Sequence, residues 1–179
     1  MPGEEARDFQ PKDMILIALG SNLPFAGAPP AQIMLRALGA LQQFGAVEAR
    51  SRIYRSQAWP DPSDPPFVNA VARFACALGP EALLAALHAV ETGFGRRRSA
   101  PNAPRTLDLD LLDYRGLIRR AGQAGGLILP HPRIAARDFV LAPLAEIAPD
   151  WRHPETGECA ASLLAHLGRE PYVTGSDPF

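Results

Sequence analysis

The chain has 179 residues, of which 47% are hydrophobic, so it can bury one sizeable core and is short for two ordinary domains. Its formal net charge of -1 provides no overall basic field, so we expect no nucleic-acid partner. We also expect no membrane partner, because no run reaches the roughly 18 apolar residues that span a bilayer. Two cysteines, Cys76 and Cys159, form neither a metal-binding spacing nor a disulfide framework, which favours the reducing cytoplasm.

Composition along the chain predicts a single domain with two polar ends. Residues 1–13 are polar, contain no apolar segment of an export signal and read as a flexible leader. Residues 14–170 carry the periodic hydrophobic patterns, and residues 171–179 read as a polar tail. We therefore expect one folded domain over residues 14–170.

The first elements are a strand, a helix and a second strand. Met14–Leu19 is a continuous apolar run of strand length, typical of a central strand that is covered on both faces. It ends at Gly20-Ser21-Asn22, which is either a plain turn or a source of backbone N–H groups for a ligand. Pro29-Pro30 opens an amphipathic helix, and Val47–Tyr54 follows as a strand.

A proline-rich loop at residues 56–66 precedes the third strand, Phe67–Leu78. Trp59 in this loop is either a hydrophobic clamp on the body of the protein or part of a cover over a ligand. Phe67 and Asn69 share one face of the strand by alternation. Asn69 is either an ordinary edge residue or a hydrogen-bonding partner for a heterocycle that stacks on Phe67.

A helix is predicted from Pro80 to Gly93. An arginine-rich connection joins it to the strand that carries the two candidate aspartates. Glu91 lies near the end of this helix, where a glutamate is usually solvated. The next strand, Thr106–Tyr114, carries alternating leucines that enter the core. Asp108 and Asp110, two positions apart, therefore point to the same face.

The two aspartates predict a site for phosphoryl transfer. Their spacing of roughly 6 to 7 Å along a strand suits two divalent cations about 3.5 to 4 Å apart on oxygen ligands, and Mg²⁺ is the natural occupant. Residues 96–105 add four arginines and no acid, which suits a polyphosphate. The alternative is a half-buried strand with two solvated aspartates beside a basic loop.

The remaining chain predicts additions to the sheet and more helices. Leu117-Ile118 reads as a hairpin return and Leu127–Leu129 as a short edge strand. His131 lies between two prolines, which suits a fixed phosphate contact but also occurs in plain turns. Phe139–Ile147 and Ala160–Leu167 are amphipathic and read as helices.

The element order is strand, helix, strand, strand, helix, strand, followed by additions. This order predicts an α+β fold of the ferredoxin-like βαββαβ type, with an antiparallel sheet and helices packed on one face. Extra C-terminal elements, a strand and helices, extend the sandwich.

Several short motifs occur in one order and at a consistent spacing between about residue 14 and residue 150. They are Ala18-Leu19-Gly20-Ser21-Asn22-Leu23, Tyr54-Arg55-Ser56, Phe67-Val68-Asn69-Ala70, Glu91 with Gly95-Arg96, Pro104-Arg105-Thr106-Leu107-Asp108-Leu109-Asp110, Pro130-His131-Pro132-Arg133 and Arg137-Asp138-Phe139-Val140-Leu141. With these motifs the chain resembles the 6-hydroxymethyl-7,8-dihydropterin pyrophosphokinase family. The resemblance implies transfer of pyrophosphate from ATP to the pterin hydroxymethyl group, with release of AMP, in tetrahydrofolate biosynthesis.

The resemblance also implies a role for each matching residue. Asp108 and Asp110 would hold two Mg²⁺ ions and, with Arg96 and Arg105, would be catalytic. The pterin contacts would be Ser56, Phe67, Asn69 and Phe139. The ATP contacts would be Glu91, Arg96, Arg105, His131 and Arg137. We expect the protein to act as a monomer.

Two positions depart from the family pattern. The connection before Arg105 is one residue shorter than in familiar members, and Asn102 stands where an aromatic residue is often found. Trp59 is then a candidate for the missing aromatic cover.

Two other classes of function are compatible with this fold. One is a catalytically silent module that retains nucleotide affinity, which loss of an aspartate or of Asn69 would have favoured. The other is an RNA-binding module, which needs basic and aromatic residues spread over the sheet; the near-neutral charge argues against it.

Overall fold

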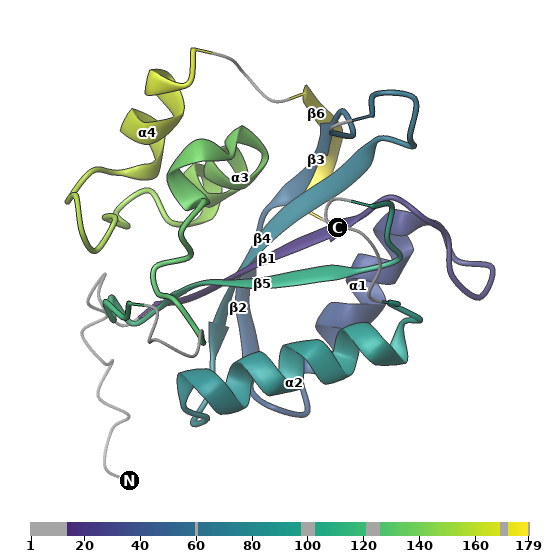
Figure 1. Ribbon diagram of the computed structural model, residues 1–179, viewed down its shortest axis with the longest axis horizontal. Coiled ribbons are helices and arrows are strands. Elements are labelled where there is room, and N and C mark those ends of the chain that lie inside the picture. Colours follow the sequence, from purple (N-terminus) through teal and green to yellow (C-terminus); the bar gives the residue numbers. More distant parts are fainter. Residues whose placement is uncertain (1–13, 60, 98–102, 121–125, 169–171, 179) are drawn as a thin grey trace, which may run out of the picture.

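The computed structural model describes residues 14–59, 61–97, 103–120 and 126–168, and the strand at residues 172–178. Figure 1 shows a twisted sheet with helices on both sides. The elements in chain order are β1 (Ile15–Ser21), α1 (Pro30–Leu41), β2 (Ala46–Arg50), β3 (Arg52–Ser56), β4 (Phe67–Ala75), α2 (Pro80–Gly93), β5 (Asp108–Tyr114), the short 3-10 helix η2 (Ile134–Ala136), α3 (Asp138–Ile147), α4 (Ala160–His166) and β6 (Tyr172–Pro178).

The described strands form one antiparallel sheet in the order β5-β1-β4-β3-β6, with β2 paired to β4 beside β3. β1 lies between β4 and β5, as its continuous apolar sequence predicted. Successive side chains of a strand leave on opposite faces, so Ile15, Ile17 and Leu19 enter one core while Met14 and Leu16 enter another. The prediction of a central strand with two covered faces is confirmed.

Helices α1 and α2 pack on one face of the sheet, and α3 and α4 pack on part of the other (Figure 1). Leu83, Leu87 and Val90 anchor α2, and burial of each contributes roughly 1.5 to 3 kcal/mol. The two helices of the predicted βαββαβ order, α1 and α2, share one face, and α3 and α4, the predicted C-terminal additions, pack on the other. These later helices bury Leu141 and Trp151 against the face that carries Leu16.

Three sequence-based boundaries need correction. The single strand predicted over Val47–Tyr54 is divided into β2 and β3 at Ser51, whose Oγ accepts a hydrogen bond from the Val71 N–H while its own N–H donates to the Val71 carbonyl. Leu117-Ile118 and Leu127–Leu129 form no strands, and only a single bridge joins Arg119 to Leu129.

The C-terminal segment also differs from the prediction. Residues 172–178 were expected in a polar tail, but they form β6, which pairs with β3 at the sheet edge. The predicted leader at residues 1–13 lies outside the described residues. Within the described chain, no helix has the length and apolar character that a membrane span requires.

Because α3 and α4 cover only part of their face, one end of that face stays open. Phe67, Asn69, Asp108 and Asp110 lie at this end, on the same side of the sheet as Leu16 and Val71. The open end therefore contains most of the residues that the sequence singled out.

Candidate active site

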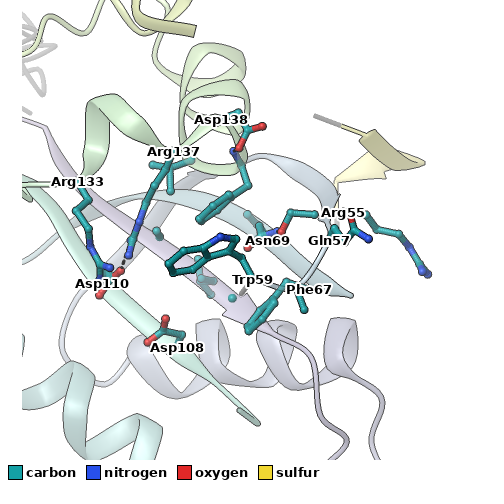
Figure 2. Close-up of a pocket in the computed structure, with 18 of the residues that line it drawn as sticks. Arg55, Gln57, Trp59, Phe67, Asn69, Asp108, Asp110, Arg133, Arg137 and Asp138 are labelled. Carbon is teal, nitrogen blue, oxygen red and sulfur yellow. Dashed lines mark hydrogen bonds and ion pairs between the residues drawn. The ribbon is translucent and has the colours of Figure 1, made fainter. Parts of the chain in front are cut away.

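A cavity of about 610 Å³ lies over the open end of the sheet, in the size range of small-molecule sites. Its walls come from β1, β3, β4, β5, the loop after β3 and the start of α3 (Figure 2). The cavity thus joins segments that are far apart in the sequence.

The floor of the cavity is made by small residues of β1. In the antiparallel register Gly20 lies between Asn69 on β4 and Asp108 on β5, and Ala18 lies beside Asp110. A Cβ atom at Gly20 would lie 3.6 Å from Asn69 Oδ1 and 3.7 Å from Asp108 Cβ. The absence of a side chain at Gly20 therefore leaves an open surface between the amide and the carboxylate.

Asp108 and Asp110 both line the cavity, so the predicted shared face of β5 is confirmed. The alternate residues Leu109 and Leu111 are buried in the core with α1 and α2. This follows from the two-residue period of the strand, which turns every second side chain to the same face.

Both carboxylates are engaged by arginines. Arg96 Nη1 donates to Asp108 Oδ1, and Arg105 Nη1 lies 2.9 Å from Asp108 Oδ2. Arg137 Nη1 lies 2.8 Å from Asp110 Oδ2 (Figure 2). Burial acts against ionisation of Asp110, but His131 and Arg137 hold its pKa below the ordinary value. The site therefore keeps Asp110 ionised and places cationic groups around it.

Glu91 lies behind the arginines and is not among the residues that line the cavity. Its Oε1 accepts hydrogen bonds from the Leu109 N–H at 2.8 Å and from Arg96 Nη1 at 2.6 Å. Only 7% of Glu91 is exposed, and burial raises its pKa to about 7. The solvated alternative is therefore wrong, and Glu91 connects the end of α2 to β5 and to Arg96.

His131 lies beside Asp110, with Nε2 3.7 Å from Asp110 Oδ2. Its Nδ1 accepts a hydrogen bond from the Arg133 N–H, so in the neutral ring the proton is on Nε2. Burial, together with the nearby charges of Arg137 and Arg133, lowers the pKa of His131. The ring thus presents its Nε2–H on the carboxylate side of the site.

The other half of the cavity is aromatic and carries one buried amide. Phe67 and Phe139 line it, and the guanidinium groups of Arg105 and Arg137 lie 5.5 Å and 5.7 Å from their ring centroids. The side chain of Asn69 donates to Ser56 Oγ at 2.9 Å, and no described residue donates to its Oδ1. A carbonyl acceptor is thus available in a cavity that two phenylalanines also line.

The turn after β1 has a structural task that the sequence left open. The N–H groups of Asn22 and Leu23 donate to the Arg105 carbonyl, so they are not available to a ligand. Asn22 Oδ1 accepts from the Arg105 N–H at 2.7 Å, and its Nδ2 donates to the Pro65 carbonyl at 2.9 Å. Asn22 therefore fixes the ends of both loops that border the cavity.

The structure brings most of the predicted site residues to one place. Those that line the cavity are Ser56, Phe67, Asn69, Arg105, Asp108, Asp110, Arg137 and Phe139. Arg96, Glu91 and His131 lie directly behind the carboxylates. Asn102 lies outside the described residues.

Sequence reasoning missed several contributors. Arg55, Gln57, Arg133 and Asp138 also line the cavity (Figure 2). Arg55, Arg133 and Asp138 stand in the motifs that carry the resemblance but received no role, and for Gln57 the only signal was its position next to Ser56. The role of Asn22 depends on contacts across 83 and 43 residues, which no local pattern reports.

The donor set fits a hard divalent cation that is shared with a ligand. No group of three His, Cys, Asp or Glu side chains with metal-binding geometry occurs among the described residues. Mg²⁺ is commonly held by one or two carboxylates together with water and substrate phosphates, so Asp108 and Asp110 suffice. The surrounding arginines supply charge for those phosphates.

Comparison with protein families gives one match, to 7,8-dihydro-6-hydroxymethylpterin-pyrophosphokinase (HPPK), over residues 16–149. A 2-amino-4-hydroxy-6-hydroxymethyldihydropteridine pyrophosphokinase of Synechocystis is 44% identical over 121 residues, which cover 68% of this chain and 60% of the relative. One of the same name from Pseudomonas aeruginosa is 39% identical over 153 residues, which cover 84% of this chain and 90% of the relative.

Longer proteins also match. The folic acid synthesis protein fol1 of Pneumocystis carinii is 36% identical over 87% of this chain, and the match covers only 20% of that protein. The crystal structure of wild-type Plasmodium falciparum HPPK-DHPS superposes with a TM-score of 0.65 at 11% identity, over 86% of this chain and 44% of that one. At this identity the structural likeness shows the fold alone.

Proposed function

The chain belongs to the 7,8-dihydro-6-hydroxymethylpterin-pyrophosphokinase family, and from this premise we propose that it transfers pyrophosphate from ATP to 6-hydroxymethyl-7,8-dihydropterin, with release of AMP, in tetrahydrofolate biosynthesis. One observation carries the proposal: a single cavity is lined by two carboxylates that pair with arginines and by the amide of Asn69 and two phenylalanines. The first half suits a metal-bound polyphosphate and the second half suits a flat heterocycle.

The pterin binds between Phe67 and Phe139. Asn69 Oδ1 accepts a hydrogen bond from a ring N–H, because its amide nitrogen is already oriented by Ser56 Oγ. Offset stacking of the heterocycle on each phenylalanine adds roughly 0.5 to 1.5 kcal/mol to the burial of its area. Ser56 thus orients the Asn69 amide, and it also lines the cavity in which the pterin binds.

ATP phosphates bind at the arginine side. Arg105 and Arg137 line the cavity and turn from Asp108 and Asp110 toward the phosphates when these arrive. Arg96 lies behind them, held by Glu91, and His131 offers its Nε2–H beside Asp110. Glu91 therefore contributes to ATP binding by holding Arg96.

Asp108 and Asp110 would hold Mg²⁺, as two ions shared with the phosphates. Bound there, Mg²⁺ supplies charge neutralisation for the polyphosphate and orients its oxygens. The protein contributes two rigid carboxylates on one strand, and their arginine partners are released to the phosphates.

The reaction needs positioning more than a protein nucleophile. The hydroxymethyl oxygen attacks the β-phosphorus of ATP, the hydroxyl loses its proton as the new P–O bond forms, and the bond to the AMP oxygen breaks. The arginines stabilise the charge on the transferred group and on AMP. No covalent enzyme intermediate is involved.

Other features of the proposal follow from the same reasoning. Two observations support a ferredoxin-like plan. The elements follow one another as β1, α1, β2 with β3, β4, α2 and β5. In the sheet the strands lie in the order β5-β1-β4-β3. We propose that the chain from residue 14 through β6, which pairs with β3, acts as one domain, as a cytoplasmic monomer.

The central experiment measures AMP formation from ATP. We expect AMP only when both Mg²⁺ and 6-hydroxymethyl-7,8-dihydropterin are present. Asp108→Asn and Asp110→Asn should each lower kcat by about 10²-fold or more, because each removes a carboxylate for the cation. If both variants kept wild-type turnover, the proposed metal site would be wrong.

Calorimetry on the same protein distinguishes the proposed enzyme from a catalytically silent nucleotide-binding module. Such a module binds a non-hydrolysable ATP analogue but forms no AMP with the pterin present. The proposed enzyme binds the analogue and also forms AMP from ATP.

A further inference from the structure

Trp59 is the most exposed large hydrophobic residue among those described, with 72% of its surface accessible. Tryptophan is usually well buried, and an exposed indole at a cavity is typical of recognition sites. The second tryptophan, Trp151, is the opposite case: it is 1% exposed, and its Nε1 donates to Asp113 at 2.7 Å. The chain therefore has one structural and one accessible indole.

The exposure decides between the two roles that the sequence left open for Trp59. A hydrophobic clamp would bury its indole against the body of the protein. Here the neighbouring Ala58 is buried, at 7% exposure, and attaches the loop. Trp59 lies beside this anchor and lines the cavity, so it is not a clamp.

Trp59 lies at the half of the cavity that is proposed to bind the heterocycle. It follows Ser56, which orients Asn69, by three residues. In Figure 2 its ring lies among Asn69, Phe67 and the two aspartates, over the cavity that all of them line. No described residue accepts a hydrogen bond from its indole N–H. Both the face and the polar edge of the ring are therefore available to a ligand.

We infer that Trp59 is a binding residue for the pterin and forms an aromatic wall of its site beside Phe67 and Phe139. This inference rests on the proposed function and adds a specificity-determining residue to it. With the two faces of the heterocycle on the phenylalanines, the indole of Trp59 closes an edge of the site, and this contact removes the exposed ring from water.

Substitution and binding measurements test the inference. Trp59→Ala should raise the Kd and the KM for the dihydropterin by about tenfold, the size of one lost aromatic contact, with the Kd for an ATP analogue and kcat within about twofold of wild type. Trp59→Phe keeps an aromatic face and should lie between the two. Leu35→Ala, which truncates an exposed residue of α1 away from the cavity, is the matched control and should behave as wild type.

Intrinsic fluorescence provides a readout that is independent of turnover. Only two tryptophans are present, and Trp151 is buried, so the accessible emission comes from Trp59. Pterin should quench the wild-type emission in a saturable manner at the Kd found by calorimetry. In Trp59→Phe this quenching should disappear, while the emission of Trp151 and the thermal unfolding curve stay unchanged.

The outcomes separate this inference from the proposed function. If wild type binds and converts the pterin while Trp59→Ala has unchanged Kd and KM, or Trp59→Phe retains the quenching, the role of Trp59 is disproved and the proposed function stands. If wild type neither binds nor converts the pterin, both are disproved. A loss of ATP-analogue affinity equal to the loss of pterin affinity would also overturn the inference, because it would indicate a general effect on the cavity.

Discussion

The absence of a side chain at Gly20 keeps the cavity floor open between an amide and a carboxylate. This residue lies in β1 between Asn69 and Asp108, at the boundary between the heterocycle half and the phosphate half of the cavity. A methyl group there would touch Asn69 and Asp108 only at ordinary van der Waals distance. It would, however, project into the space over which a bound ligand lies.

Gly20→Ala should therefore fold normally and bind poorly. We expect thermal unfolding to change by less than about 2 °C, and the Kd for the dihydropterin to rise by about tenfold because the methyl group separates ligand and floor. Gly39→Ala on α1 is the control: apart from the chain neighbours and the helix's own backbone, no described atom lies within 4 Å of its Cβ, so ligand binding stays unchanged. Unfolding curves and calorimetry on both variants check this, and wild-type affinity in Gly20→Ala would place the ligand elsewhere.

The buried carboxyl of Glu91 should make stability depend on pH. Its pKa is about 7 in the folded protein against 4.5 in the unfolded chain. Between these values the folded state binds more protons, so the Glu91 contribution to the free energy of unfolding falls as pH rises. Below about pH 4.5 the residue is protonated in both states and its contribution is constant.

Glu91→Gln should remove this part of the pH dependence. The stability difference between wild type and variant should decline by up to about 3 kcal/mol between roughly pH 4.5 and pH 7 and be flat outside that range. Urea unfolding at several pH values measures it. Glu81→Gln, at an exposed position of the same helix, should run parallel to wild type, and a parallel course for Glu91→Gln would contradict the assignment.

At the level of elements, the site depends on how loops are attached to the sheet. Ser21 and Asn22 end β1, and Ser21 Oγ donates to the Thr106 carbonyl at 2.6 Å. Asn22 holds Arg105 on one side and Pro65 on the other. Through these contacts one turn positions the chain before Asp108 and the chain before Phe67.

Asn22→Ala should release both attachments. Two side-chain hydrogen bonds are lost, each worth about 0.5 to 1.5 kcal/mol, so the free energy of unfolding should fall by about 1 to 3 kcal/mol. The KM for ATP should rise as well, because the Arg105 backbone loses one of the hydrogen bonds that hold it, from its N–H to Asn22 Oδ1. Urea denaturation and steady-state kinetics test this, with the exposed Gln43→Ala as control. A stability loss with an unchanged KM for ATP would show that the turn at Asn22 does not position the ATP site.

Helix α3 positions the opposite wall of the cavity. Its N-terminal residues Arg137 and Phe139 face the cavity, while Leu141 and Leu144 are buried in the second core. The Tyr54 hydroxyl donates to Glu146 Oε2 at 2.9 Å, which connects the helix to β3. The phosphate and pterin contacts from this helix are thus fixed by its packing on the sheet.

At the level of the whole molecule, the cavity joins β1, the loop after β3, β5 and α3, so ligands that fill it should stabilise the entire fold. A ligand that binds only the folded state at 100 times its Kd adds about 2.7 kcal/mol. For a chain of this size that corresponds to a rise in Tm of about 5 to 10 °C.

We expect an ATP analogue with Mg²⁺ and the dihydropterin together to raise the Tm by more than either does alone. Differential scanning calorimetry measures the shift. Asp110→Asn should lose most of the response to the nucleotide with Mg²⁺ and keep the response to pterin. Equal responses of wild type and variant would show that Asp110 does not serve the nucleotide side.

What the sequence by itself determined is the part that depends on local periodicity. The alternation in β5 placed Asp108 and Asp110 on one face and the leucines in the core, because a strand turns successive side chains to opposite sides wherever it lies. The apolar run of β1 likewise predicted a central strand. The chemical roles of the two aspartates remain predictions.

Only the tertiary structure decided which distant groups meet. The attachment by Asn22, the contact of Glu91 with β5, the pairing of β6 with β3 and the exposure of Trp59 over the cavity all depend on contacts between segments far apart in the chain. Such contacts are selected by the packing of the whole core and leave no periodic signal in a single sequence, so neither strand pattern nor spacing could predict them.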